Sequence, residues 1–121
     1  MKVAIIGASK NKQKYGNISI RAYKKQGYTL FPVNPKEKEI EGLKVYKSIL
    51  DIPEEIDRAS IYLPPQIGII ILEEIAQKGV KEVFLNPGSE SDELIKKAEK
   101  LGLNFMIACS IVDINENPND Y

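Results

Sequence analysis

The sequence predicts a doubly wound α/β domain, with a mainly parallel sheet of about five strands and helices on both faces. Short runs of β-branched and apolar residues alternate along the chain with longer stretches whose apolar residues recur at helical spacing. Glycine and proline separate these segments through short loops, which favours right-handed crossovers between parallel strands. The 121 residues are enough for one domain, and we expect a single domain over residues 1–121.

The first predicted strand–helix–strand unit covers residues 2–33. Lys2–Ile6 is a short apolar run that ends at Gly7, as expected for a strand buried on both faces of a parallel sheet. Tyr15–Gln26 carries apolar residues at helical spacing and is followed by a glycine, which is typical of a helix end. Tyr28–Val33 is again rich in β-forming residues, and Pro35 stops it. Two parallel strands joined by a helix are therefore expected.

The rest of the chain repeats this alternation after a polar stretch. In residues 36–51 we expect only a brief strand at Lys44–Tyr46 and a short helix at Ser48–Leu50. Strands and helices then alternate strictly in the order Ala59–Leu63, Gln66–Lys78, Glu82–Leu85, Ser91–Leu101 and Asn104–Ile107. The tail from Asn115 has no such pattern and is expected to be frayed.

Composition excludes several classes of protein. Seventeen basic residues balance seventeen acidic ones, so no overall charge attracts the chain to nucleic acid or to anionic lipid. No apolar run approaches the roughly 20 residues that span a bilayer. The chain has no histidine, which removes the commonest general base and the commonest metal ligand. With a single cysteine, Cys109, and no secretory signal, a cytoplasmic location is expected.

The ends of the predicted strands carry the residues of a nucleotide site. In an open, Rossmann-like sheet, ligands collect outside the carboxyl ends of the strands. Four of these ends have loops rich in glycine, proline, asparagine or lysine, namely Gly7–Ser9, Val33–Lys36, Leu63–Pro65 and Asn86–Gly88. We expect these loops to form one rim.

The first of these loops is a predicted phosphate site. The small side chains of Gly7, Ala8 and Ser9 allow a ligand to approach the backbone. The helix that starts near Tyr15 or Gly16 directs free N–H groups and the positive end of its dipole at the same loop. The spacing differs from the Gly-x-Gly-x-x-Gly fingerprint and from the Walker A sequence. A turn glycine with no ligand is the alternative interpretation.

The end of the second strand favours a ribose that carries a phosphate. An NAD site usually has an acidic residue about 20 residues after the glycine loop, whereas this chain has Asn34 followed by Lys36. Together with the lysines of the first loop, Lys36 suits the additional phosphate of coenzyme A or NADP. A cluster of solvated lysines is the alternative.

The other two loops and the cysteine are less specific. Pro64 and Pro65 form a rigid wall without amide donors, which suits an adenine or a pantetheine arm or simply ends a strand. Asn86 offers a side-chain amide and Gly88 exposes backbone, although both also fit an ordinary turn. Without a histidine to activate it, Cys109 fits a small buried residue better than a nucleophile.

These residues resemble those of a known family. The segments Val3–Ser9 and Tyr28–Lys36 and the later turns are similar to the stand-alone CoA-binding domains, over nearly the whole chain. That family resembles the N-terminal CoA-binding domain of the succinyl-CoA synthetase α subunit, and Val33–Lys36 is the most specific match. The resemblance implies coenzyme A or an acyl-CoA as ligand. The synthetase uses a separate domain with a phosphorylated histidine for its chemistry, so ligase activity is not carried over.

The resemblance also implies a role for each residue of the rim. The phosphates would be surrounded by Gly7, Ala8, Ser9, Lys14, Tyr15 and Gly16. The ribose phosphate would be received by Asn34, Pro35 and Lys36. The adenine and pantetheine side would be lined by Leu63, Pro64 and Pro65. The thiol-bearing arm would be flanked by Asn86, Pro87 and Gly88. Cys109 falls where relatives often have a cysteine.

Three functional hypotheses follow. A module that binds CoA or acyl-CoA without catalysis is favoured, because no acid–base or nucleophilic constellation is evident. An oxidoreductase or redox-sensing domain that binds NAD(P) is the alternative, since the fold alone does not select the ligand. The third is a partner protein whose ligand site has been lost and which serves a homo-oligomer or an acyl-CoA-using enzyme such as an acyltransferase.

Overall fold

A computed structural model describes all residues from Met1 to Tyr121. It contains a five-stranded sheet with the strand order β2-β1-β5-β6-β7, and all four strand pairings are parallel. The strands are β1 (Lys2–Ile6), β2 (Thr29–Val33), β5 (Arg58–Ile61), β6 (Glu82–Leu85) and β7 (Phe105–Ile107). The predicted α/β fold is therefore confirmed, with strand bounds within two residues of those expected.

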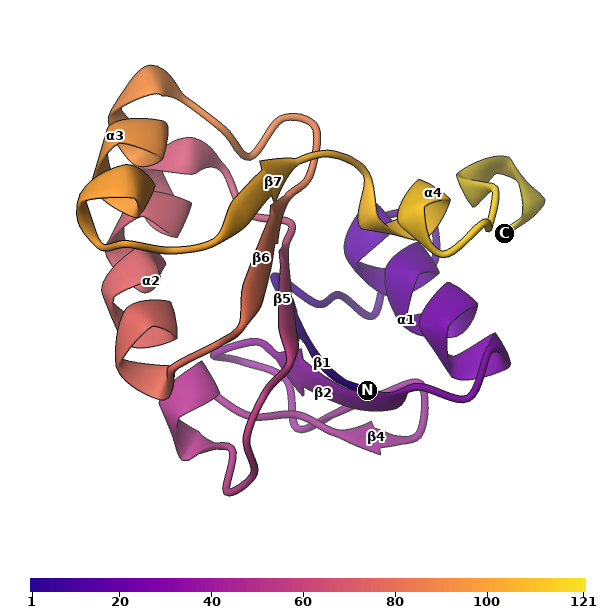
Figure 1. The fold of residues 1–121 in the computed structure, drawn as a ribbon. Coiled ribbons are helices and arrows are strands. Elements are labelled where there is room, and N and C mark those ends of the chain that lie inside the picture. Colours follow the sequence, from indigo (N-terminus) through magenta and orange to yellow (C-terminus); the bar gives the residue numbers. More distant parts are fainter.

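Helices cover both faces of the sheet (Figure 1). They are α1 (Tyr15–Lys25) and α4 (Ser110–Asp113) on one face, and α2 (Pro65–Lys78) and α3 (Asp92–Lys100) on the other. Alternate residues of β1 supply the two cores: Ala4 and Ile6 pack on the α2–α3 side, and Val3 and Ile5 on the α1–α4 side. All four side chains are buried, which explains why the sequence of β1 is continuously apolar.

The strand order reverses at β1. The chain passes from β1 to β2 on one side and later returns to β5 on the other side. Such a switch point leaves a crevice at the carboxyl ends of the strands, because the connections that leave them diverge. As β2 lies at the edge of the sheet, it tolerates Pro32, which has no N–H for a further strand. The fold thus places the loops after β1, β2 and β5 around one crevice.

The polar stretch forms a small hairpin that the sequence did not predict. The strands β3 (Glu39–Ile40) and β4 (Leu43–Lys44) pair antiparallel. Glu41 and Gly42 form the two-residue turn with positive φ values of 50° and 76°. The predicted strand at Lys44–Tyr46 is shorter in the structure: Lys44 ends β4, and Tyr46 forms a single parallel bridge with Val33. The predicted short helix is the 3₁₀ turn η1 (Ile49–Asp51).

A buried arginine ties α4 to the sheet. Nη1 of Arg58 donates hydrogen bonds to the Asp113 carboxylate at 2.9 Å and to the Tyr23 hydroxyl at 3.0 Å, and Nε donates to Glu82 at 2.5 Å. Burial disfavours the charged guanidinium, but the hydrogen bonds that it donates to Tyr23 and Glu82 outweigh this effect and raise the pKa of Arg58. These contacts explain why α4, which has no sequence signature, forms where it does.

No helix of the chain is both long and apolar enough to cross a bilayer.

The prediction of a frayed tail from Asn115 is wrong. The tail ends in the 3₁₀ turn η2 (Pro118–Asp120) and lies beside α1 (Figure 1). The Tyr121 hydroxyl donates to Glu116 at 2.7 Å, and the guanidinium of Arg21 lies 5.5 Å from the Tyr121 ring centroid. The Gln26 amide also donates to Glu116 at 2.7 Å. The contacts of Gln26 and Arg21 join the tail to a helix at least 90 residues away in the sequence, so local periodicity cannot reveal them.

The tail contact makes a testable prediction about tyrosine ionisation. The hydrogen bond to Glu116 raises the pKa of Tyr121 to about 12. Because the pKa is higher in the folded protein, the stabilisation is fully present below the ordinary tyrosine value near 10 and is lost as pH rises towards 12. We expect the phenolate absorbance difference between wild type and Tyr121→Phe to titrate near pH 12, and near the ordinary value in a Glu116→Gln background. An ordinary midpoint in the wild-type protein would contradict the ordered tail.

Candidate functional site

A cavity of about 900 Å³ opens at the carboxyl ends of β1, β2, β5 and β6. Its size lies within the range of about 300–1,000 Å³ that is usual for small-molecule sites. Most of the residues predicted from the strand ends line it, namely Gly7, Ala8, Ser9, Lys14, Tyr15, Gly16, Asn34, Pro35, Leu63, Pro64, Pro65, Pro87 and Gly88. Lys36 and Asn86 do not line it. The predicted loops therefore do converge on one cavity.

Close packing fixes the first turn of α1 against the loop after β1. Gly7 has a positive φ of 87°, and a Cβ on it would lie 2.6 Å from the Tyr62 carbonyl oxygen. A Cβ on Gly16 would lie 2.3 Å from the Gly7 carbonyl oxygen. Real Cβ atoms do not come so close to backbone atoms, so both positions require glycine. Gly7 is therefore required by the geometry of the turn itself and by its packing against Tyr62.

Several residues that line the cavity have a backbone N–H group without a partner in the protein. The N–H groups of Gly7 and Ala8 both donate to the Val33 carbonyl at 3.2 Å, so they serve the sheet. Those of Ser9, Tyr15 and Gly16 donate no hydrogen bond within the protein, and all three residues line the cavity. Free N–H groups at the start of a helix attract anions. The arrangement suits a phosphate. Of the expected loop and helix donors, Ser9, Tyr15 and Gly16 are free, and Gly7 and Ala8 are not.

Internal hydrogen bonds hold the loop after β1 in place. The side-chain amide of the buried Asn17 donates to the Ser9 carbonyl at 2.9 Å and to Glu41 at 3.2 Å. Its side-chain oxygen accepts from Arg21 at 2.7 Å, and Arg21 also donates to the Lys12 carbonyl at 2.6 Å. The loop is therefore fixed by α1 before any ligand binds, which lowers the entropy cost of binding. Sequence reasoning missed Asn17, because a polar residue inside a helix gives no signal of its own.

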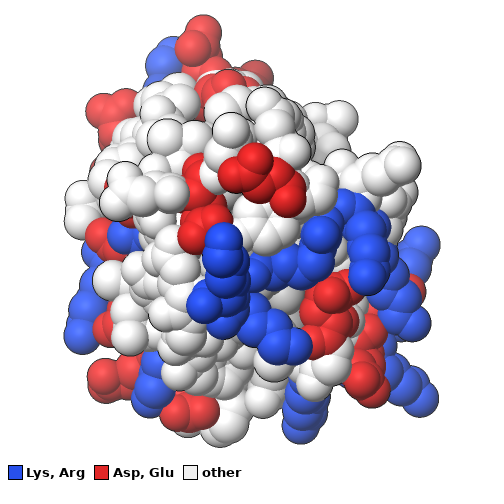
Figure 2. All heavy atoms as spheres, turned by 90° about the vertical axis from the view of Figure 1, so that its right-hand side faces the viewer, with Lys and Arg blue, Asp and Glu red and all other residues white.

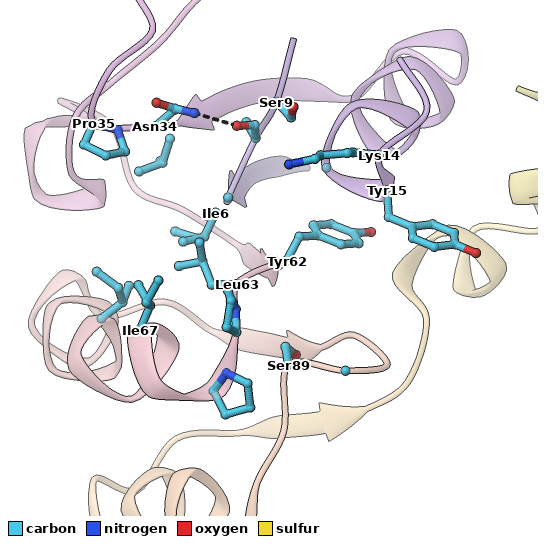
Figure 3. A pocket seen from close by; sticks show the side chains of 18 of the residues that line it. Ile6, Ser9, Lys14, Tyr15, Asn34, Pro35, Tyr62, Leu63, Ile67 and Ser89 are labelled. Atoms are coloured by element: carbon cyan, nitrogen blue, oxygen red, sulfur yellow. Dashed lines mark hydrogen bonds between the residues drawn. The ribbon is translucent and has the colours of Figure 1, made fainter. Parts of the chain in front are cut away.

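Lys14 supplies a positive charge at the same end of the cavity. Figure 3 shows its side chain extending from the start of α1 over the opening, whereas the ring of Tyr15 points away from the other labelled side chains. Lys14 forms no ion pair. Lys10, in the same loop, is paired with Glu37 at 2.9 Å. Of the loop lysines, Lys14 is thus the one that lines the cavity with its charge free.

Asn34 shapes the rim through hydrogen bonds within the protein. Its amide nitrogen donates to the Ala8 carbonyl at 2.8 Å, the contact drawn in Figure 3. Its oxygen accepts from the backbone N–H groups of Lys36 at 2.7 Å and Glu37 at 3.1 Å. The side chain therefore joins the loops after β1 and β2 and turns the chain outward. Lys36 follows this turn onto the exposed surface, away from the cavity wall.

An apolar wall on the side of α2 lies across the cavity from Lys14 and the start of α1. Leu63 and Pro64 precede the helix, and Ile67 and Ile71 lie on its first two turns. Leu63 and Ile67 are labelled in Figure 3. Ile67 is 47% exposed although it is a large apolar residue. A cavity with free amides and a lysine at one end and apolar side chains at the other suits a ligand with the same division.

Asn86 lies beneath the rim, and its side chain is engaged within the protein. It is 2% exposed, its nitrogen donates to Ser60 Oγ and to the Ile61 carbonyl, and its oxygen accepts from the Ser110 N–H, all at 2.9 Å. The amide predicted as a ligand contact therefore joins β5, β6 and α4. The Ser110 hydroxyl also bonds to the Tyr62 hydroxyl at 3.0 Å, and burial raises the pKa of Tyr62.

The remaining reactive groups lie elsewhere. Cys109 is partly buried and packs against the core between the sheet and α1, and it does not line the cavity. No group of three or more His, Cys, Asp or Glu side chains converges as a metal site would require. Figure 2 shows lysine and arginine side chains gathered on the face that carries α1 and the C-terminus, with carboxylates among them. Some of these opposite charges are paired: Lys25 in α1 forms an ion pair of 3.5 Å with Glu116 in the tail.

Several cavity residues escaped the sequence analysis. They are Ile6, Gln13, Lys47, Tyr62, Ile67, Ile71 and Ser89. Most are neighbours of predicted residues, and one-residue shifts at loop ends account for them. Lys47 is different, because it belongs to the polar stretch whose path could not be predicted.

Comparison with known proteins points to one ligand. A family model described as a CoA-binding domain matches residues 1–115. The ADP-forming acetate–CoA ligase of Methanocaldococcus jannaschii is 46% identical over 109 residues, which cover 87% of this chain and 16% of the ligase. The α subunit of ADP-forming acetate–CoA ligase II of Pyrococcus furiosus is 35% identical over 115 residues, covering 86% of this chain and 25% of the subunit. The chain thus spans only a quarter or less of these two relatives.

Solved structures agree with this result. A conserved hypothetical protein from Pyrococcus furiosus superimposes with a TM-score of 0.86 at 37% identity, over 93% of this chain and 97% of the other. A dinucleotide-forming acetyl-coenzyme A synthetase from Candidatus Korarchaeum cryptofilum, solved with phosphate and ADP, superimposes with a TM-score of 0.78 at 27% identity, over 88% of this chain and 25% of the other. The same fold therefore occurs both as nearly the whole of a chain and as part of a longer one.

Proposed function

Since the chain belongs to the CoA-binding domain family, we propose that its cavity binds coenzyme A. The diphosphate would lie at the start of α1, and the domain would have no catalytic role. The observation that supports this most is the set of free N–H groups of Ser9, Tyr15 and Gly16 beside the unpaired Lys14. Coenzyme A carries its diphosphate next to an adenosine with a flat aromatic base, and the cavity has hydrogen-bond donors next to an apolar wall. The NAD(P) alternative finds no support among the relatives.

The two ends of the ligand would contact different loops. The adenosine would lie between the loop after β2 and the apolar wall of Leu63, Pro64 and Ile67. The pantetheine arm would leave along Pro87 and Gly88, where exposed backbone can bond to its amides. In this proposal Asn34 and Asn86 position the loops and do not touch the ligand.

The wider role is also a proposal. The relatives named above are CoA ligases or their subunits, which supports an acyl-CoA as the physiological ligand and an acyl-CoA-using enzyme as partner. We further propose that residues 1–121 form one domain. A free, partly buried Cys109 fits a reducing compartment, which supports the cytoplasm as the location.

Coenzyme A is expected to stabilise the protein, and NADP or NADH is not. A ligand at a hundred times its Kd adds about 2.7 kcal/mol to the free energy of unfolding, which corresponds to a Tm increase of roughly 10 °C for a domain of this size. Differential scanning fluorimetry and calorimetric titration measure both effects. A shift with NADP or NADH and none with millimolar coenzyme A would refute the proposal.

Matched lysine variants locate the phosphates in the same assay. Lys14→Ala should weaken coenzyme A binding about tenfold, because it removes a free cation from the anion site. Lys100→Ala is the control, since this residue is also exposed but lies at the end of α3, away from the cavity. Equal affinities of the two variants would argue against phosphates at the start of α1.

A further inference from the structure

We infer that Lys47, and not the predicted Lys36, recognises the phosphate on the ribose and so selects coenzyme A over its 3′-dephospho form. The inference rests on the proposed function and adds to it the residue that determines ligand selectivity. Lys47 lies in the segment between β4 and η1 and carries no signal in the sequence. It is nevertheless the only lysine besides Lys14 that lines the cavity.

Backbone pairing brings Lys47 to the ribose end. The Tyr46 N–H donates to the Pro32 carbonyl and the Asn34 N–H donates to the Tyr46 carbonyl, both at 2.9 Å. Tyr46 thereby forms a parallel bridge with Val33, the last residue of β2. Lys47 follows directly and emerges beside Asn34 at the carboxyl edge of the sheet. In Rossmann-type sites, the ribose lies at this end of the second strand.

The other lysines near this end are directed elsewhere or already paired. The N–H of Lys36 is bound to the Asn34 side chain, and the turn that results carries Lys36 out to the exposed surface. Lys10 is paired with Glu37 at 2.9 Å. Lys44 lies 5.1 Å from the Tyr46 ring centroid and does not line the cavity. Only Lys47 therefore combines the position with access to the cavity.

The charge of Lys47 is also available. Lys47 forms no ion pair. A carboxylate on the neighbouring helix, Glu74, instead accepts a hydrogen bond from Ser48 at 2.5 Å. A phosphate monoester carries a charge of about −1.5 to −2 at pH 7, and a lysine ammonium binds such a group as a flexible point charge. Removing the phosphate from the ribose removes this interaction and leaves the diphosphate site unchanged.

The test compares two ligands and four proteins. Calorimetry would measure the affinities of coenzyme A and 3′-dephospho-coenzyme A for the wild type, Lys47→Ala, Lys36→Ala and Lys44→Ala. We expect the wild type to prefer coenzyme A by about tenfold or more, which is the size of one hydrogen bond to a charged group. Lys47→Ala should lose this preference through weaker binding of coenzyme A alone, while the two control variants keep it. All three lysines are exposed, so folding is not expected to suffer.

Other outcomes would overturn the inference in distinguishable ways. If Lys36→Ala abolishes the preference and Lys47→Ala does not, the ribose phosphate lies where the sequence predicted it. If Lys47→Ala weakens both ligands equally, Lys47 acts on a group that they share. If the wild type binds both ligands equally well, the ribose phosphate is not recognised, although coenzyme A binding stands. If the wild type binds neither ligand, the proposed function itself fails.

Discussion

Gly16→Ala is expected to abolish coenzyme A binding and to destabilise the protein, although alanine is normally the better helix residue. In an ordinary helix this change stabilises by about 1 kcal/mol. Here the new Cβ would lie 2.3 Å from the Gly7 carbonyl oxygen and 3.5 Å from Ala8 Cα. Gly7 cannot move away from the new Cβ. Its Cα already packs against the Tyr62 carbonyl, and its N–H donates to the Val33 carbonyl. Helix α1 must therefore move away from the loop.

The expected size follows from overpacking, which costs about 1–3 kcal/mol and occasionally more. We expect a net loss of about 1–3 kcal/mol in the free energy of unfolding. Coenzyme A affinity should fall about a hundredfold or more, since the free N–H groups of Tyr15 and Gly16 would shift relative to that of Ser9. Urea unfolding and calorimetric titration of the same variant measure the two effects.

A second helical glycine provides the control. A Cβ on Gly68, in α2, would lie 3.3 Å from Leu94 Cδ1, the end of a flexible side chain, and 3.9 Å from a methyl group of Ile61. Gly68→Ala should stay within about 1 kcal/mol of the wild type, because the helix-propensity gain offsets a small adjustment. It should bind coenzyme A normally. If Gly16→Ala behaved in the same way, the close approach of α1 to the loop would not be needed for the site.

The fold could be predicted because its determinants are local. Each sheet strand is a short apolar run, and each of the helices α1, α2 and α3 has a clear start or end in the sequence. In α3, for example, Ser91 caps the helix by accepting from the Leu94 N–H at 3.1 Å. The hairpin β3–β4, α4 and the tail could not be predicted in this way. They depend on contacts between distant residues, such as Arg58 with Asp113 at 2.9 Å.

The site shows the same division. The sequence indicates which loops meet, because the carboxyl ends of parallel strands must share one edge. It does not indicate which side chains are used up inside the protein. Asn34 and Asn86 look like ligand contacts in the sequence, yet both are engaged by backbone and side chains of neighbouring loops. Lys47 looks like a surface lysine, yet a single bridge at Tyr46 brings it to the cavity.

Asn86→Asp is expected to be among the most destabilising isosteric changes in the chain. The wild-type amide donates to Ser60 Oγ and to the Ile61 carbonyl. A carboxylate in its place would turn an oxygen towards that carbonyl and would remain a buried charge at a position only 2% exposed. An uncompensated buried charge costs about 3–5 kcal/mol, and we expect a loss of this size at pH 7 in urea unfolding.

The pH dependence separates this explanation from a role in ligand binding. Burial would raise the pKa of the new carboxyl in the folded protein, so the folded state would hold its proton more tightly than the unfolded state. The deficit relative to the wild type should therefore be largest at neutral pH and shrink as pH falls towards the unfolded pKa of about 4. Asn104→Asp, at an exposed position with one hydrogen bond of 3.3 Å to the Lys81 carbonyl, should change stability by no more than about 0.5 kcal/mol. The contrary result would be an Asn86→Asp protein that has wild-type stability but binds coenzyme A poorly. It would show that Asn86 contacts the ligand, because the new negative charge would repel the phosphates without disturbing the junction of β5, β6 and α4.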